Sequence, residues 1–204
     1  MIALGVLVSG GGTNLQAILD AIEREKLDAS VRVVLSNKAG AGGLERAARA
    51  KIPSVVVDHK AHTSRDAFDQ AVVDALRAYG VEWVVLAGFM RIVTPVLLSA
   101  FPMRVVNIHP ALLPSFPGID AQRQAFEHGV RVTGCTVHLV DSGTDTGPIL
   151  AQRAVPVLEG DDVESLKARI LIAEHELLPE VLQWIADGRV NVEAEGGRAR
   201  VRVG

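Results

Sequence analysis

Short apolar runs alternate with segments of helical periodicity through the first half of the chain. Five runs are brief, β-branched and almost wholly apolar, as expected of strands covered on both faces of a parallel sheet; they are residues 2–8, 31–36, 54–57, 83–87 and 104–108. Between the third and fourth runs, Phe68, Val72, Leu76 and Tyr79 fall on one helical stripe. This alternation predicts a Rossmann-like, doubly wound arrangement with helices on both faces.

The pattern changes after Pro110. Two longer apolar runs, 133–140 and 149–157, follow a loop and a short helix, and they predict a hairpin around the polar loop 141–148. Asp161 or Asp162 is expected to cap a long helix that ends near Asp187, and residues 190–203 a last small hairpin. The predicted fold is a single α/β domain of residues 1–204, whose mostly parallel sheet has an antiparallel C-terminal extension.

Composition narrows the class of partner. The 204 residues are 49% hydrophobic, which suits one compact domain. With 21 basic against 24 acidic residues, the net charge of -3 predicts neither nucleic-acid nor membrane binding, so a small-molecule ligand is expected. A lone cysteine, Cys135, and an opening apolar run too short for an export signal fit the cytoplasm. A monomer or a homodimer is expected.

Residues 9–14, Ser-Gly-Gly-Gly-Thr-Asn, lie between the first predicted strand and a helix. Glycines let the backbone approach a ligand, and a helix N-terminus offers N–H groups and a positive dipole end. The stretch therefore predicts a phosphate site at Gly12, Thr13 and Asn14. It matches neither the dinucleotide pattern Gly-x-Gly-x-x-Gly in its usual register nor a Walker A loop. The alternative is a tight turn in which Thr13 or Asn14 only caps the helix.

Asn107 and His109 stand two residues apart at the end of the fifth predicted strand, so both side chains project from the same face. An amide that donates to a developing oxyanion and an imidazole that titrates near neutrality suit acyl transfer. The alternative is that both are local hydrogen-bonding groups.

The loop 141–148 supplies acids near this predicted strand end. An acid there is expected to orient His109 and raise its pKa, whereas the alternative makes Asp141 and Asp145 ordinary turn formers. A metal site of His109, His138, Asp141 and Asp145 is disfavoured, because no closely spaced ligand pattern such as His-Glu-x-x-His is present.

Several stretches together resemble one family. They are residues 109–118, His-Pro-Ala-Leu-Leu-Pro-Ser-Phe-Pro-Gly; 133–138, Thr-Gly-Cys-Thr-Val-His; 145–148, Asp-Thr-Gly-Pro; 9–14; and 87–91, Ala-Gly-Phe-Met-Arg. The chain is similar from end to end to the folate-dependent formyltransferases of purine synthesis, and the resemblance implies their fold. It also implies transfer of a formyl group from 10-formyltetrahydrofolate, the co-substrate, to the amine of glycinamide ribonucleotide, without a metal.

The resemblance assigns roles by motif match. It makes Asn107, His109 and Asp145 catalytic, and it places the substrate phosphate at residues 12–14. The ribose is expected near Glu174, although Leu171 stands where some family members carry a polar residue. The folate is expected along Arg65, Met90, Arg91, Ile92, Val93 and Val140. The resemblance implies a phosphate-binding half, 1–108, and a folate and catalytic half, 109–204.

Three alternative functions use parts of the same pattern. A formyltetrahydrofolate deformylase would use the same three side chains with water as acceptor, but that family carries an extra N-terminal domain and a different first loop. A methionyl-tRNA formyltransferase would add a C-terminal RNA-binding domain and a basic surface. A non-enzymatic nucleotide-binding module remains compatible with a doubly wound fold, because a fold does not fix a function. That module would bind a ribose phosphate without formyl transfer.

Overall fold

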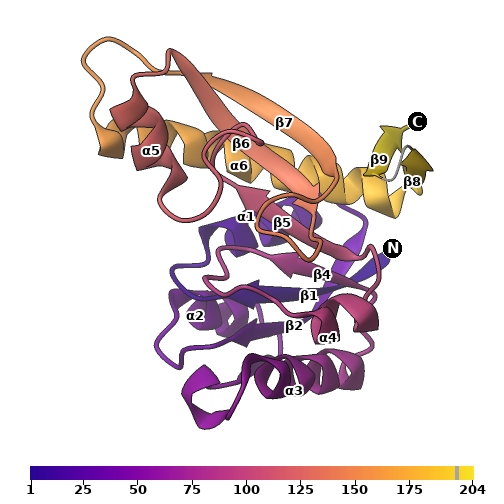
Figure 1. The fold of residues 1–204 in the computed structure, drawn as a ribbon. Coiled ribbons are helices and arrows are strands. Elements are labelled where there is room, and N and C mark those ends of the chain that lie inside the picture. Colours follow the sequence, from indigo (N-terminus) through magenta and orange to yellow (C-terminus); the bar gives the residue numbers. More distant parts are fainter. Residues whose placement is uncertain (196–197) are drawn as a thin grey trace. The chain divides into compact units, whose positions relative to one another are not determined.

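The computed structural model describes residues 1–195 and 198–204. It contains two compact units, Met1–Asn107 and Ile108–Gly204, which we call the first and the second unit (Figure 1). Strand β5, Val105–His109, crosses the boundary between them. Each unit is described below by itself.

The strands of the first unit form a parallel sheet in the order β3, β2, β1, β4 and β5. Their interiors are apolar and buried because helices cover both faces of the sheet. Their bounds are β1 Ile2–Val8, β2 Ala29–Ser36, β3 Ser54–Val56 and β4 Trp83–Leu86. All five predicted strands of this half are confirmed, with ends that shift by one or two residues.

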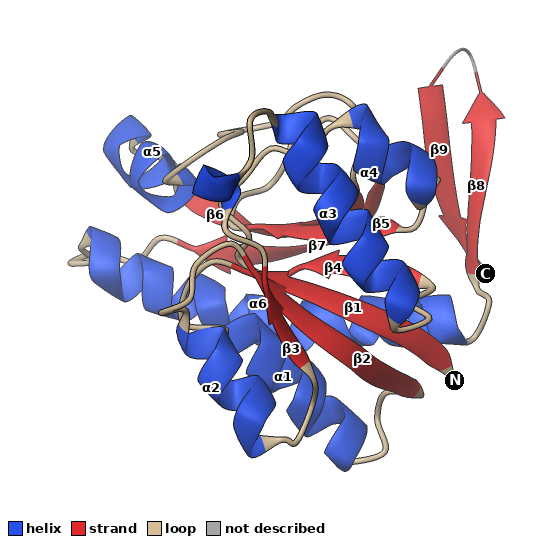
Figure 2. Ribbon diagram, turned by 90° about the horizontal axis from the view of Figure 1, so that it is seen from below, coloured by secondary structure: helices blue, strands red, loops and turns tan. Residues whose placement is uncertain are grey.

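Helices α1 and α2 lie on one face of this sheet, and α3 and α4 lie on the other (Figure 2). Helix α3 carries the predicted apolar stripe inward, with Phe68, Val72 and Leu76 buried, and Ser64 caps its first turn. Helical segments were predicted between the strands, but α2 and α4 were not located individually, because eight and six residues are too few to establish a helical period. The bounds are α1 Thr13–Glu23, α2 Gly42–Arg49, α3 Arg65–Ala78, α4 Pro95–Ala100 and a 3-10 turn, η1 His59–Ala61.

The second unit pairs strands β6, Val132–Leu139, and β7, Ile149–Pro156, as the predicted antiparallel hairpin. Helix α6, Val163–Ala186, packs on both strands, and α5, Ala121–His128, packs on α6. Asp162 caps α6 through a capping box with Ser165, as one of the two predicted caps. The last hairpin, β8 Val190–Glu195 and β9 Arg198–Val203, is also confirmed.

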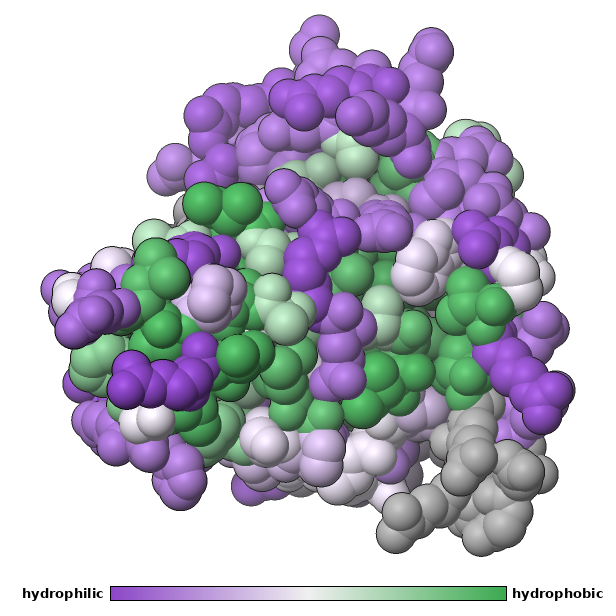
Figure 3. All heavy atoms as spheres, turned by 90° about the horizontal axis from the view of Figure 1, so that it is seen from above, coloured by the Kyte–Doolittle hydropathy of each residue, from purple (hydrophilic) through white to green (hydrophobic). Residues whose placement is uncertain are grey.

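The surface keeps some apolar side chains exposed. On the face shown in Figure 3, apolar residues form a broad area, and polar residues surround it and also run across it. In the first unit, Met90 is 73% exposed and Ile92 is 59% exposed. Among the described residues of this unit, Met1 is the one large apolar residue that is more exposed. Met90 and Ile92 both belong to the predicted folate segment. Among the described residues, no helix is long and apolar enough to cross a membrane.

Candidate active site

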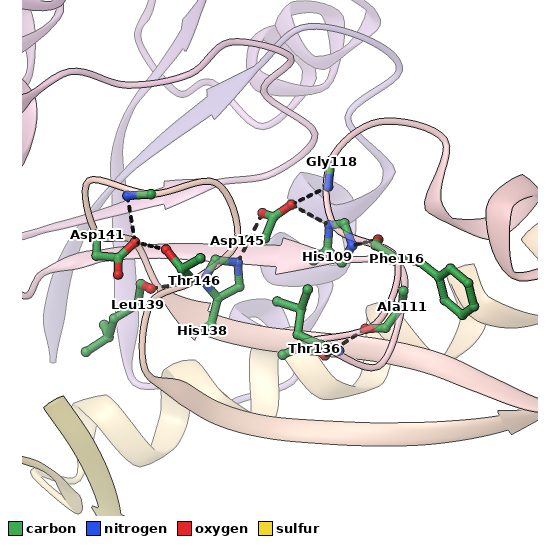
Figure 4. A network of polar contacts seen from close by, with 12 residues as sticks. His109, Ala111, Phe116, Gly118, Thr136, His138, Leu139, Asp141, Asp145 and Thr146 are labelled. Atoms are coloured by element: carbon green, nitrogen blue, oxygen red, sulfur yellow. Dashed lines mark hydrogen bonds and ion pairs between the residues drawn. The ribbon is translucent and has the colours of Figure 1, made fainter. Parts of the chain in front are cut away.

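His109, the last residue of β5, is buried to 4% exposure and has an acceptor at each ring nitrogen (Figure 4). Its Nε2 lies 2.8 Å from the Phe116 carbonyl oxygen, and its Nδ1 lies 3.3 Å from Asp145 Oδ2. A carbonyl and an ionised carboxylate only accept hydrogen bonds, so both contacts are hydrogen bonds only when the ring carries both protons. The geometry thus suits a histidine that cycles through its charged form.

Asp145 is held from three directions. The Gly118 backbone N–H donates to Oδ2 over 2.8 Å, the same oxygen faces His109, and His138 Nε2 lies 3.6 Å from Oδ1. The backbone of Asp145 has φ 55°, in the left-handed region that few residues other than glycine adopt. Its environment therefore differs from that of an ordinary turn former.

His138 joins this cluster from β6, where it is 1% exposed. Its Nδ1 lies 2.9 Å from the Leu139 carbonyl oxygen, which orients the ring so that Nε2 faces Asp145. From the sequence, His138 belongs to the family-like stretch 133–138 and is a disfavoured metal ligand, without a predicted catalytic role. The alternation along β6 signals that its side chain shares a face with Thr136, but the pairing with Asp145 arises from the fold.

Burial has the largest single effect on the pKa values of His109 and Asp145. Desolvation lowers the pKa of His109, and although the Phe116 carbonyl and the Asp145 charge oppose this shift, the pKa stays below its ordinary value. The prediction that an acid of this loop raises the pKa of His109 is confirmed for the contribution of Asp145, but burial outweighs that contribution. Burial raises the pKa of Asp145, but hydrogen bonds from His138 and Gly118 and the nearby histidine charges lower it on balance. Asp145 is thus ionised at neutral pH.

Asp141 organises the loop that carries Asp145. Its Oδ1 accepts the Gly143 N–H over 3.0 Å and the Thr146 hydroxyl over 2.8 Å. The turn-former interpretation is therefore confirmed for Asp141, whereas Asp145 points to the histidines (Figure 4). Among the described residues, no group of three or more His, Cys, Asp or Glu is arranged to hold a metal ion.

The glycine-rich segment of the first unit ends at Gly12, which has φ 69° and precedes α1. The N-cap residue is Gly12, which has no side chain, so neither Thr13 nor Asn14 occupies the N-cap position. A Cβ atom on Gly12 would lie 2.5 Å from the Cα of Gly43 at the start of α2. Glycine is required there by both the backbone angle and the contact, and the first turn of α1 keeps the features of an anion site.

The predicted folate residues of the first unit lie on two segments. Arg65 begins α3, and residues 90–93 follow β4. Met90 and Ile92 are exposed, Val93 is buried, and the Arg91 guanidinium lies 5.0 Å above the Phe68 ring. A segment that presents apolar side chains to the solvent beside a cation has the chemistry to bind an aromatic, negatively charged ligand.

Two further predicted residues lie in the second unit. Glu174 is on α6 and only 6% exposed, with the half-buried Leu171 about one turn before it. Val140 directly follows β6 and precedes the loop of Asp145. The structure therefore brings His109, Asp145 and His138 together, and places Val140 at the base of the same loop.

Residues 3–182 match the family model described as Formyl transferase. The chain shares 56% identity with glycinamide ribonucleotide transformylase 1 from Symbiobacterium toebii, with a TM-score of 0.96 over 100% of this chain and 94% of that one. This match confirms the predicted fold class, an α/β fold of mostly parallel strands with antiparallel C-terminal strands.

Two curated relatives differ in how much of their length is matched. Phosphoribosylglycinamide formyltransferase from Escherichia coli is 45% identical over 92% of this chain and 88% of its own length. The human trifunctional purine biosynthetic protein adenosine-3 is also 45% identical, over 95% of this chain but 19% of its own length. The chain thus corresponds to one segment of such multifunctional proteins.

Proposed function

The chain belongs to the formyl transferase family, and from that premise we propose that it is a phosphoribosylglycinamide formyltransferase. It transfers the formyl group of 10-formyltetrahydrofolate to the amine of glycinamide ribonucleotide, giving N-formylglycinamide ribonucleotide and tetrahydrofolate in purine synthesis. The observation that carries this proposal is the buried pair of His109 and Asp145 at the end of β5, with Asn107 two residues earlier on the same strand.

The reaction develops negative charge on the formyl oxygen as the amine attacks the formyl carbon. Asn107 and His109 supply the hydrogen-bond donors that stabilise this charge, and they are most effective where burial excludes water. His109 Nδ1 stays with Asp145, while Nε2 exchanges the Phe116 carbonyl for the formyl oxygen. The oxyanion then collapses and breaks the bond to the folate nitrogen.

Asp145 favours the charged form of the imidazole while the proton of the attacking amine moves to the departing folate nitrogen. The carboxylate suits this role because its pKa is lowered and its position is fixed by Gly118 and His138. Carboxylate orientation of a histidine is a recurring device in acid–base sites.

We assign the substrate contacts to the residues that the sequence predicts for them. The phosphate binds at Gly12, Thr13 and Asn14, at the start of α1, whose N-cap residue Gly12 has no side chain, and the ribose hydroxyls bind Glu174. The folate lies along Arg65, residues 90–93 and Val140. The absence of a metal requirement, action in the cytoplasm and the state of the enzyme as monomer or homodimer stay predictions.

The test measures formyl transfer from 10-formyltetrahydrofolate with three acceptors: glycinamide ribonucleotide, its phosphate-free analogue and water. Transfer only to the phosphorylated amine is expected. Formate release without an amine acceptor would indicate a deformylase, and no reaction would indicate a binding module.

Variants test the catalytic assignment within the same assay. Loss of one preorganised oxyanion donor lowers turnover by about a hundred- to a thousandfold, so His109→Ala and Asn107→Ala are each expected to lose at least that much with folding intact. The exposed His128 serves as the matched control, and His128→Ala is expected to keep near-normal turnover. Normal turnover of His109→Ala would remove this histidine from the mechanism.

A further inference from the structure

Two loops of the first unit meet at one hydroxyl group. Residues 9–14 follow β1, residues 87–94 follow β4, and these two strands are neighbours in the sheet. Ser9, the first residue after β1, donates its backbone N–H to the Gly88 carbonyl oxygen over 3.1 Å. The Met90 backbone N–H donates to Ser9 Oγ over 2.8 Å. Ser9 thus bonds, through backbone and side chain, to the middle of the other loop.

The hydroxyl is also fixed from a third side. Ser9 Oγ donates its hydrogen to Asn37 Oδ1 over 2.7 Å, which leaves the oxygen lone pairs for the Met90 N–H. Ser9 is 6% exposed and Asn37, just after β2, is 3% exposed. Buried hydrogen bonds of this kind hold their geometry closely, because an unpaired partner carries the full desolvation cost.

The other parts of both loops are anchored as well. The Gly43 N–H at the start of α2 donates to the Gly10 carbonyl oxygen over 3.0 Å. At the end of the second loop, the Thr94 N–H donates to Oδ2 of the buried Asp69 over 2.5 Å. Each loop is thus also held by the sheet or a helix, and Ser9 bonds the two loops directly to each other.

We propose that Ser9 is a positioning residue that couples the phosphate loop, residues 9–14, to the folate segment, residues 87–94. The inference rests on the proposed function, which places one substrate at each loop. A ligand that immobilises one loop also restrains the other through Ser9, so the second ligand binds with a smaller loss of conformational entropy. The coupling is reciprocal, because each ligand changes the affinity of the other by the same factor.

The test measures the dissociation constant of tetrahydrofolate with and without saturating glycinamide ribonucleotide, a pair that cannot react because no formyl group is present. In the unaltered protein, glycinamide ribonucleotide is expected to tighten tetrahydrofolate binding by about fivefold or more. In Ser9→Ala the ratio of the two constants is expected to fall towards one, even if both affinities decrease. Ser9→Thr, which keeps the hydroxyl, is expected to retain the ratio.

Ser36 provides the matched control. It ends β2 and is 2% exposed, and among the described residues its hydroxyl bonds to the backbone of Lys38, as donor to the carbonyl and acceptor from the N–H. Ser36→Ala therefore removes a buried hydroxyl without touching residues 87–94, and the ratio is expected to stay unchanged. Asn37→Ala removes the acceptor that orients Ser9 Oγ, and it gives a second measurement if Ser9→Ala does not fold.

The outcomes distinguish a failure of the Ser9 coupling from a failure of the proposed function. A ratio near one in the unaltered protein, or an unchanged ratio in Ser9→Ala and Asn37→Ala, would overturn the coupling while formyl transfer stands. If neither ligand binds the unaltered protein, the proposed function fails and the coupling fails with it.

Discussion

At the scale of single residues, Asp145 shows how an environment changes the role of a side chain. Aspartate is common in turns, and Asp141 behaves in that way through its bonds to Gly143 and Thr146. Asp145 instead faces two buried histidines and has φ 55°. The difference arises from where each carboxylate points, because both residues belong to the same short loop.

The pair of His109 and Asp145 predicts a measurable titration. Because the Asp145 charge stabilises the protonated ring, Asp145→Asn is expected to lower the pKa of His109 further. The ring signals of His109 in an NMR titration measure this shift. Asp141→Asn is the control, since its carboxylate bonds to Gly143 and Thr146 rather than to His109. A raised or unchanged His109 pKa in Asp145→Asn would contradict the assignment.

The same pKa shifts set the dependence of stability on pH. His109 binds its proton more weakly in the folded than in the unfolded chain, so its contribution to folding is present above pH 6.5 and is lost as the pH falls towards its folded pKa. Asp145, with its pKa lowered from 3.8, contributes stability above that pH and loses it in stronger acid. The free energy of unfolding is therefore expected to decline first below pH 6.5, and denaturant titrations at several pH values measure it.

At the scale of elements, the start of α1 combines a special backbone angle with close packing. Gly12 has φ 69°, and its Cα faces Gly43 of α2 closely enough to exclude a Cβ atom. The glycines therefore do more than make the turn flexible. They let two helix starts approach each other, and the N-cap residue of α1, Gly12, carries no side chain.

Gly12→Ala is expected to raise the KM for glycinamide ribonucleotide by about tenfold or more, since 1.4 kcal/mol of lost phosphate binding is a factor of ten. Gly80→Ala is the matched control, because Gly80 also has a positive φ, of 64°. Among the described residues beyond its two chain neighbours, no heavy atom lies within 4 Å of the position that a Cβ atom on Gly80 would take. Both variants lose roughly 1–2 kcal/mol of stability through the left-handed angle. Steady-state kinetics with thermal unfolding measures both effects, and equal KM values in the two variants would contradict the phosphate site.

At the scale of the whole molecule, the reactivity of Cys135 measures how readily the folded structure opens. Cys135 is the single cysteine of the chain and is fully buried in β6. Burial raises the pKa of its thiol to about 12, so it reacts as thiolate only when the structure around it opens. Its reactivity therefore measures opening rather than catalysis.

Alkylation of Cys135 at pH 8 is expected to be far slower in the folded protein than in denaturant. Saturating glycinamide ribonucleotide and tetrahydrofolate should slow it further, because a ligand at 100 times its Kd stabilises the folded state by about 2.7 kcal/mol. Mass spectrometry of the modified chain measures the rate. A thiol that reacts as fast in the folded as in the unfolded protein would contradict this account.

Local patterns in the sequence determined the strands, the long helices and the position of His109 at a strand end. They succeeded for β1 and α6 because apolar periodicity and the Asp162 cap act between near neighbours in the chain. Helices α2 and α4 were not located individually, because they are too short to show a period.

Only the tertiary structure decided the chemistry around His109. It brought His138 to Asp145 and gave Asp145 its left-handed backbone. It also buried His109 deeply enough that desolvation lowers the pKa despite the adjacent carboxylate. The reason is physical: a pKa depends on solvent exclusion and on charges supplied by residues distant in sequence, and neither is determined until the chain has folded.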